Sequence, residues 1–168
     1  MTFIDQLMII ISAFGDLIIL SLAFIVLAVI LVKKEKIKEA ILFFISLFGG
    51  SLLTYLIKIL VQKPRPDGAL ISASGYSFPS GHAVHAVIFY SLLIFLFKDD
   101  IKNHLVRYLF IFMNIAIILL VGLSRIYLRV HFASDVIFGY VLGLVWLTMC
   151  IFLMKYFAGF NILKKARL

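Results

Sequence analysis

The chain has 168 residues, of which 64% are hydrophobic and only 14% are charged. A soluble domain is about 45–50% apolar and about 25% charged, so this composition excludes an ordinary soluble protein and predicts one membrane-embedded domain over residues 1–168. The net charge of +8 does not indicate nucleic-acid binding, because the cations are spread over loops between apolar segments.

The N-terminal part of the chain contains two apolar runs separated by a break. Residues 3–14 are mostly apolar, Gly15-Asp16 interrupts the run, and a second run covers 17–32. Together they exceed the roughly 20 residues that span a bilayer. We therefore expect a short interfacial helix, a break and the first spanning helix. One long tilted helix is the alternative, and the sequence does not decide between them.

Four further spans follow the charged loop at 33–39. The apolar runs predict helices at about 40–61, 80–97, 105–124 and 132–155. The first of these ends at a proline-containing stretch, and a loop rich in Gly, Ser and Ala follows it. The next helix is expected to begin at Pro79 or Ser80. The predicted fold is an all-α, polytopic membrane helix bundle of about five transmembrane helices plus a short N-terminal interfacial helix.

Three polar motifs interrupt this apolar sequence. They are Lys58…Arg65-Pro66, Pro79-Ser80-Gly81-His82 and Ser124-Arg125…His131…Asp135. A charge at membrane depth costs roughly 2.5–3.5 kcal/mol, and such residues usually face a site rather than lipid. In the predicted topology all three motifs lie at helix ends on the same face of the membrane. This shared position favours a common site.

The third motif can supply a nucleophile. If the last span is helical from His131, then Asp135 lies one turn further on the same face. A carboxylate that holds one ring nitrogen as N–H leaves the lone pair of the other nitrogen free to attack. An interfacial histidine followed by a helix-capping aspartate is the alternative interpretation of this pair alone.

The second motif can bind an anion at a helix N-terminus. Backbone N–H groups there point outward, and Ser80 and Gly81 suit close approach by a phosphate oxygen. His82, in the first turn, can then protonate a leaving oxygen as a general acid. An ordinary helix cap followed by a core histidine is the alternative.

The remaining cations of the motifs come from separate segments. Lys58, Arg65 and Arg125 can stabilise the charge that spreads over the oxygens of a transferring phosphoryl group. Snorkelling to lipid headgroups is the commoner role of a single terminal cation.

Taken together, the three motifs resemble those of the phosphatidic acid phosphatase type 2 superfamily of integral-membrane lipid phosphatases, over about residues 15–155. The resemblance implies that His131 is the nucleophile and forms a phosphohistidine, that Asp135 is its partner and that His82 is the general acid. It also implies a phosphate-binding set and a reaction without metal or other cofactor. That phosphate-binding set is Lys58, Arg65, Ser80, Gly81 and Arg125.

Two more cations flank the motifs. Arg129 and Lys63 can recognise a second phosphate or a phosphorylated sugar headgroup, or they can contact bulk anionic lipid. The candidate substrates are a polyprenyl diphosphate, lipid A 1-phosphate, phosphatidylglycerol phosphate and phosphatidate. A phosphotransferase could use the same residues. A transporter or structural bundle would favour charges within the spans and internal repeats, and a vanadate haloperoxidase is ordinarily soluble.

The distribution of cations predicts the orientation. Five of the 16 lysines and arginines belong to the motif side. The eleven on the other side are Lys33, Lys34, Lys36, Lys38, Lys98, Lys102, Arg107, Lys155, Lys164, Lys165 and Arg167. Cytoplasmic loops carry such an excess, so we expect a prokaryotic cytoplasmic-membrane protein with its site on the extracytoplasmic face.

Overall fold

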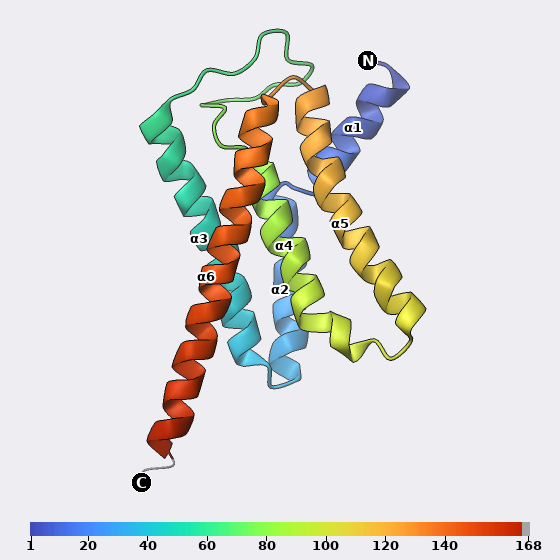
Figure 1. Cartoon of the computed structure of the whole chain (residues 1–168). Helices are drawn as coiled ribbons and strands as arrows, with labels where there is room; N and C mark the ends of the chain where they lie inside the picture. Colours follow the sequence, from blue (N-terminus) through green and yellow to red (C-terminus); the bar gives the residue numbers. More distant parts are fainter. Residues whose placement is uncertain (166–168) are drawn as a thin grey trace.

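The computed structural model describes the backbone of residues 1–165 and the side chains of residues 1–157. Within that range the chain is helical, without strands (Figure 1), which confirms the predicted fold class. The elements are α1 (Phe3–Ala13), α2 (Leu17–Lys33), α3 (Ile37–Val61), α4 (Gly81–Phe97), the short 3-10 helix η1 (Lys98–Asp100), α5 (His104–Tyr127) and α6 (Ala133–Lys165). The side chains of the expected cytoplasmic cations Lys164, Lys165 and Arg167 lie outside the described residues.

The membrane-spanning character of the helices is clear from their length and surface. Among the described residues, 4 helices are long and apolar enough to cross a bilayer, and α1 with α2 forms a further candidate bent by 47°. The break predicted at Gly15-Asp16 is therefore confirmed. Large apolar side chains such as Leu60 (82% exposed) and Ile18 (72% exposed) cover the outside of the bundle. In a bilayer these faces meet lipid, while helical hydrogen bonds satisfy the backbone.

Helix ends are set by local chemistry that shifts several predicted boundaries. The Asp16 side chain caps α2 by accepting from Ile18 and Ile19 N–H groups. α5 continues past residue 124 to Tyr127, and Arg129 then takes a left-handed conformation with φ of 54°. α6 begins at Ala133, close to the predicted start at about residue 132. α4 begins at Gly81 with Ser80 as its N-cap, rather than at Pro79 or Ser80.

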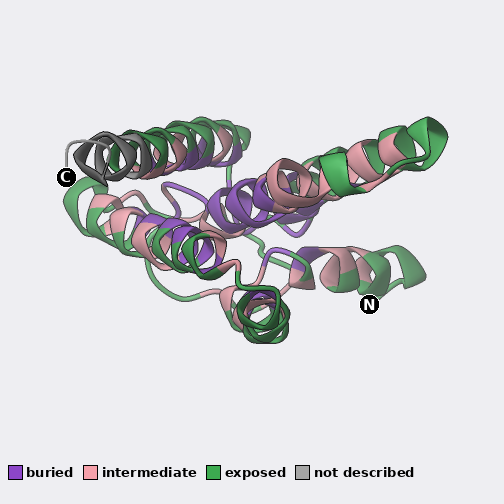
Figure 2. Ribbon diagram, turned by 90° about the horizontal axis from the view of Figure 1, so that it is seen from below, coloured by how far each residue is buried: buried purple, intermediate pink, exposed green. Residues whose placement is uncertain are grey.

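α4 occupies the centre of the bundle and packs against α3, α5 and α6. Buried residues gather in the middle of the bundle and exposed residues face outward (Figure 2). Small residues allow the close approach of α6 to α4. A Cβ added at Gly139 would lie 2.9 Å from the Ser80 carbonyl oxygen and 3.0 Å from Ala83 Cβ. This contact fixes the start of α4 against the start of α6.

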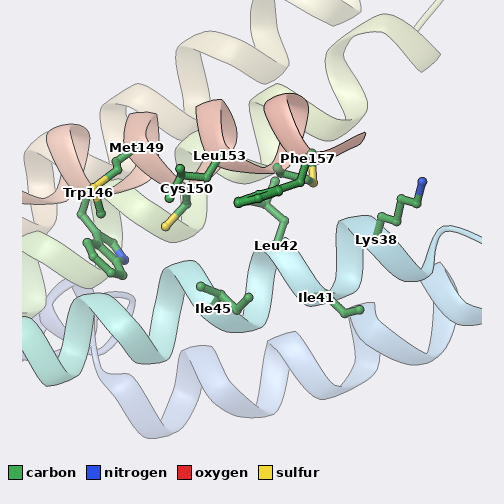
Figure 3. Close-up of a pocket in the computed structure, with 10 residues that line it drawn as sticks. Lys38, Ile41, Leu42, Ile45, Trp146, Met149, Cys150, Leu153 and Phe157 are labelled. Atoms are coloured by element: carbon green, nitrogen blue, oxygen red, sulfur yellow. The ribbon is translucent and has the colours of Figure 1, made fainter. Parts of the chain in front are cut away.

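The two ends of the bundle differ in character. At one end Lys36 pairs with Asp100 at 3.6 Å and joins the α2–α3 turn to η1. Towards that end an apolar groove of about 420 Å³ lies between α3 and α6 (Figure 3), lined by residues such as Ile41, Ile45 and Leu153. The motifs belong to the end of α3, the start of α4, the end of α5 and the start of α6, which lie towards the opposite end, where the α3–α4 loop of residues 62–80 also lies (Figure 1).

The close α4–α6 contact leads to a stability prediction. Gly139→Leu should lower the thermal unfolding midpoint in detergent, because overpacking of a tight contact typically costs about 1–3 kcal/mol. Val141→Leu is the matched control, since Val141 lies on the same helix and is 52% exposed. Equal midpoints for the two variants would contradict the close approach.

Candidate active site

The first motif lies at the end of α3 and is tied to the α3–α4 loop. Lys58 Nζ donates to the Tyr76 carbonyl oxygen at 2.6 Å. The Arg65 guanidinium donates to the carbonyl oxygens of Gly75 at 3.0 Å, Ser74 at 2.8 Å and Val130 at 2.7 Å. These bonds join the end of α3 and the start of the α3–α4 loop to residues 74–76 and to Val130. The two cations therefore fix the position of the loop, and their positive charge lies at the site.

The second motif joins α4 to α6. The Ser80 N–H donates to the Asp135 carbonyl oxygen at 3.0 Å, and the buried Ser80 Oγ has no hydrogen-bond partner among the described residues. Gly81 opens α4, so the free N–H groups of the first turn start here. Buried polar atoms are normally hydrogen-bonded, and an unpaired hydroxyl beside a helix N-terminus suits an anion.

The third motif brings the imidazole of His131 next to a fully buried carboxylate. Asp135 Oδ2 lies 3.7 Å from His131 Nδ1, and both side chains are almost completely buried. Because α6 begins at Ala133, His131 lies just outside the helix and not within its first turn as expected. Asp135 Oδ2 also accepts from the Phe132 N–H at 3.0 Å. Asp135 therefore caps the helix and faces the histidine at once.

His131 Nε2 faces a cation. Arg65 Nη1 lies 3.4 Å from this nitrogen. Burial, followed by the positive charges of Arg125, Arg65 and Lys58, lowers the pKa of His131 well below its usual value. A lowered pKa favours the neutral ring, which is the form of imidazole that carries a free lone pair.

Arg125 reaches the site from α5 and makes a contact that the sequence analysis missed. Its side chain is buried, and Nη1 donates to the Ser12 hydroxyl at the end of α1. The α1–α2 break also places Asp16 Oδ2 3.9 Å from His82 Nε2. Ser12 and Asp16 were expected only to border a break. An acidic residue inside an apolar run was the available signal, because such residues are costly in a membrane.

The two flanking cations have different surroundings. Lys63 Nζ donates to Asp135 Oδ1 at 2.6 Å and to Ser134 Oγ at 3.1 Å. It also lies over the Phe132 ring, 4.5 Å from the centroid. Arg129 is exposed, and its guanidinium lies beside Gly68 of the α3–α4 loop. Lys63 is thus engaged with Asp135, whereas Arg129 remains at the surface beside the α3–α4 loop.

The fold and this site define a class: an integral membrane protein with several cations, two histidines and two carboxylates gathered at one end of a helix bundle. The model of the PAP2 superfamily matches residues 39–158. The chain belongs to the PAP2 superfamily.

Similar proteins include lipid phosphatases. Phosphatidylglycerophosphatase B of Bacillus subtilis is 35% identical over 107 residues, which cover 62% of this chain and 53% of that protein. Human dolichyldiphosphatase 1 is 34% identical over 113 residues, which cover 59% of this chain and 48% of that protein. The chain thus spans about half the length of these relatives. A crystal structure of a transmembrane PAP2-type phosphatidylglycerolphosphate phosphatase from Bacillus subtilis matches with a TM-score of 0.82 and 27% identity, covering 95% of this chain and 78% of that one.

The ion pair between Lys63 and Asp135 can be tested by a double-mutant cycle. Lys63→Met and Asp135→Asn should each lower the thermal unfolding midpoint, since each leaves a partner without its charge. The double variant should lower the midpoint by less than the sum of the two single effects, because the stability effects of contacting residues couple by about 0.5–3 kcal/mol. Arg129→Asn, which changes an exposed cation, is the control. Strict additivity of Lys63→Met and Asp135→Asn would contradict the pairing.

Proposed function

We propose that the chain is a lipid phosphatase that hydrolyses a phosphate or diphosphate headgroup through a phosphohistidine intermediate. One observation carries the proposal: the buried imidazole of His131 has one nitrogen facing a carboxylate and the other next to Arg65. A neutral nucleophile beside fixed cations is what attack on an anionic phosphorus requires. The lipid phosphatases among its relatives support the same reaction class.

The first step is attack on phosphorus. His131 Nε2 forms the N–P bond as the bond to the leaving lipid oxygen breaks, and His82 gives that oxygen its proton. Asp135 stabilises the positive charge on the His131 ring through Nδ1. Lys58, Arg65 and Arg125, with Ser80 and the N–H groups from Gly81 onward, hold the phosphoryl oxygens.

The second step releases phosphate. His82, now neutral, takes a proton from water, and the oxygen attacks phosphorus. The N–P bond breaks, its electron pair returns to His131, and inorganic phosphate leaves. We propose that no metal takes part, because the cationic side chains supply the positive charge that a metal supplies elsewhere.

The substrate class follows from the site and its surroundings. We propose a polyprenyl diphosphate, lipid A 1-phosphate, phosphatidylglycerol phosphate or phosphatidate in the membrane. Lys63 is bound to Asp135, so recognition of a second phosphate depends on the exposed Arg129. We further propose that the chain resides in a prokaryotic cytoplasmic membrane with the site on the extracytoplasmic face, where the positive-inside rule places the end with fewer cations.

Removal of the nucleophile tests the mechanism. His131→Ala should reduce phosphate release from purified lipids by about a thousandfold or more, as loss of a nucleophile does in other enzymes. Wild-type protein treated with phosphorus-32-labelled substrate and quenched in base should carry an acid-labile phosphohistidine that His131→Ala lacks. Full activity of His131→Ala, or loss of wild-type activity with chelator, would contradict the proposal.

The headgroup role of Arg129 can be measured separately. Arg129→Asn removes the charge, and asparagine is among the residues that tolerate the left-handed backbone found here at φ of 54°. We expect about a tenfold loss of kcat/KM on a diphosphate lipid, the value of one charge-assisted hydrogen bond, and little change on a monophosphate. Arg129→Lys keeps the charge and is the control. Equal losses on both lipids would remove this role.

A further inference from the structure

The break between α1 and α2 is packed directly against the first turn of α4. A Cβ added at Gly15 would lie 2.9 Å from the His82 carbonyl oxygen and 2.5 Å from Val121 Cγ1, so no side chain fits there. Tyr90 of α4 donates to the Phe14 carbonyl oxygen at 3.0 Å. With the bond from Arg125 to Ser12, the break is held to both α4 and α5. The break lies N-terminal to the region that the family model matches.

This packing gives the Asp16 carboxylate a fixed direction. Its Oδ1 accepts from the N–H groups of Ile18 at 2.9 Å and Ile19 at 3.3 Å, which caps α2. The other oxygen, Oδ2, lies 3.9 Å from His82 Nε2. The helix cap therefore orients one oxygen and leaves the second one facing the histidine.

The surroundings of His82 make a carboxylate useful there. Arg125, Arg65 and His131 approach it from other parts of the chain, and His85 lies on its own helix. The two arginines are positively charged, so they oppose a positive ring at His82. A general acid must carry a proton before the leaving group departs. Asp16 is the acidic side chain paired with His82 among the described residues.

We propose that Asp16 is a positioning residue for His82, which it orients through Nε2 and whose protonated ring it stabilises during phosphoryl transfer. This proposal rests on the proposed phosphatase function and adds to it. Each histidine of the site then has its own carboxylate: Asp135 lies 3.7 Å from His131, and Asp16 lies 3.9 Å from His82. One arrangement serves the nucleophile and the other serves the acid.

The proton balance is simple. In the imidazolium form, the Nε2–H of His82 faces Asp16, and the Nδ1 proton passes to the leaving lipid oxygen as the P–O bond breaks. Asp16 stays ionised throughout. When water attacks the phosphohistidine, His82 Nδ1 takes the proton back and Asp16 again balances the charge.

The conservative variant is Asp16→Asn. Asparagine is as good an N-cap as aspartate, so the cap on α2 is kept while the charge facing His82 is removed. We expect kcat/KM for dioctanoyl phosphatidate to fall about 10- to 100-fold, a part of what general acid catalysis contributes. For 4-nitrophenyl phosphate, whose leaving group departs without a proton, the fall should be less than about threefold. The ratio of the two values is independent of how much protein is correctly folded.

Four further variants complete the experiment. Asp5→Asn, in the capping box of α1, should resemble wild type on both substrates. Asp16→Ser keeps a capping oxygen without charge and should repeat the selective loss. His82→Asn combined with Asp16→Asn should lose no more on phosphatidate than His82→Asn alone, since Asp16 acts through the ring.

The outcomes separate the two proposals. Equal losses of Asp16→Asn on both substrates, no loss on phosphatidate, or multiplicative losses in the double variant would each overturn the role of Asp16. In all three cases, a wild type that releases phosphate and an inactive His131→Ala would leave the phosphatase function standing. A wild type without phosphatase activity would instead overturn the function itself.

Discussion

The site is organised around one buried carboxylate, that of Asp135, which needs partners for its charge. Asp135 is fully buried, and its carboxylate accepts from Lys63 and from the Phe132 N–H while it faces His131. Its carbonyl oxygen accepts from Ser80 at the start of α4. A carboxylate in this position without such partners would carry a large desolvation penalty. The same contacts therefore hold the ends of three segments together and set the position of the imidazole.

Most of the fold could be predicted from the sequence. Apolar runs of spanning length predicted the helices, and Gly15-Asp16 marked the real break between α1 and α2. The boundaries near Arg125 and His131 were less accurate. The turn there depends on Arg129, a non-glycine residue in a left-handed conformation, for which the sequence offers no clear signal. Arg129, at φ of 54°, lies in the turn between α5 and α6, and His131 lies just before α6 begins at Ala133.

Only part of the site could be predicted from the sequence. Charged residues at helix ends predicted that Lys58, Arg65, His82, Arg125 and His131 would meet at one end, and the structure brings their segments together. The pairings of Lys63 with Asp135 and of Ser12 with Arg125 join residues far apart in the chain. Such pairings depend on how helices pack, and a single sequence does not encode them in any local pattern. The sequence indicated Asp16 only as part of a break, so its proximity to His82 was likewise not predicted.

Arg65 has a double role that affects how its variants should be understood. Three carbonyl oxygens, on Ser74, Gly75 and Val130, accept from its guanidinium and close the segment that covers the site. An Arg65→Lys substitution would keep the positive charge but would replace the planar fork with a single donor group. That variant would thus detach the covering segment from the rest of the site. Its loss of activity would report the displaced loop as much as a weaker electrostatic attraction for the headgroup.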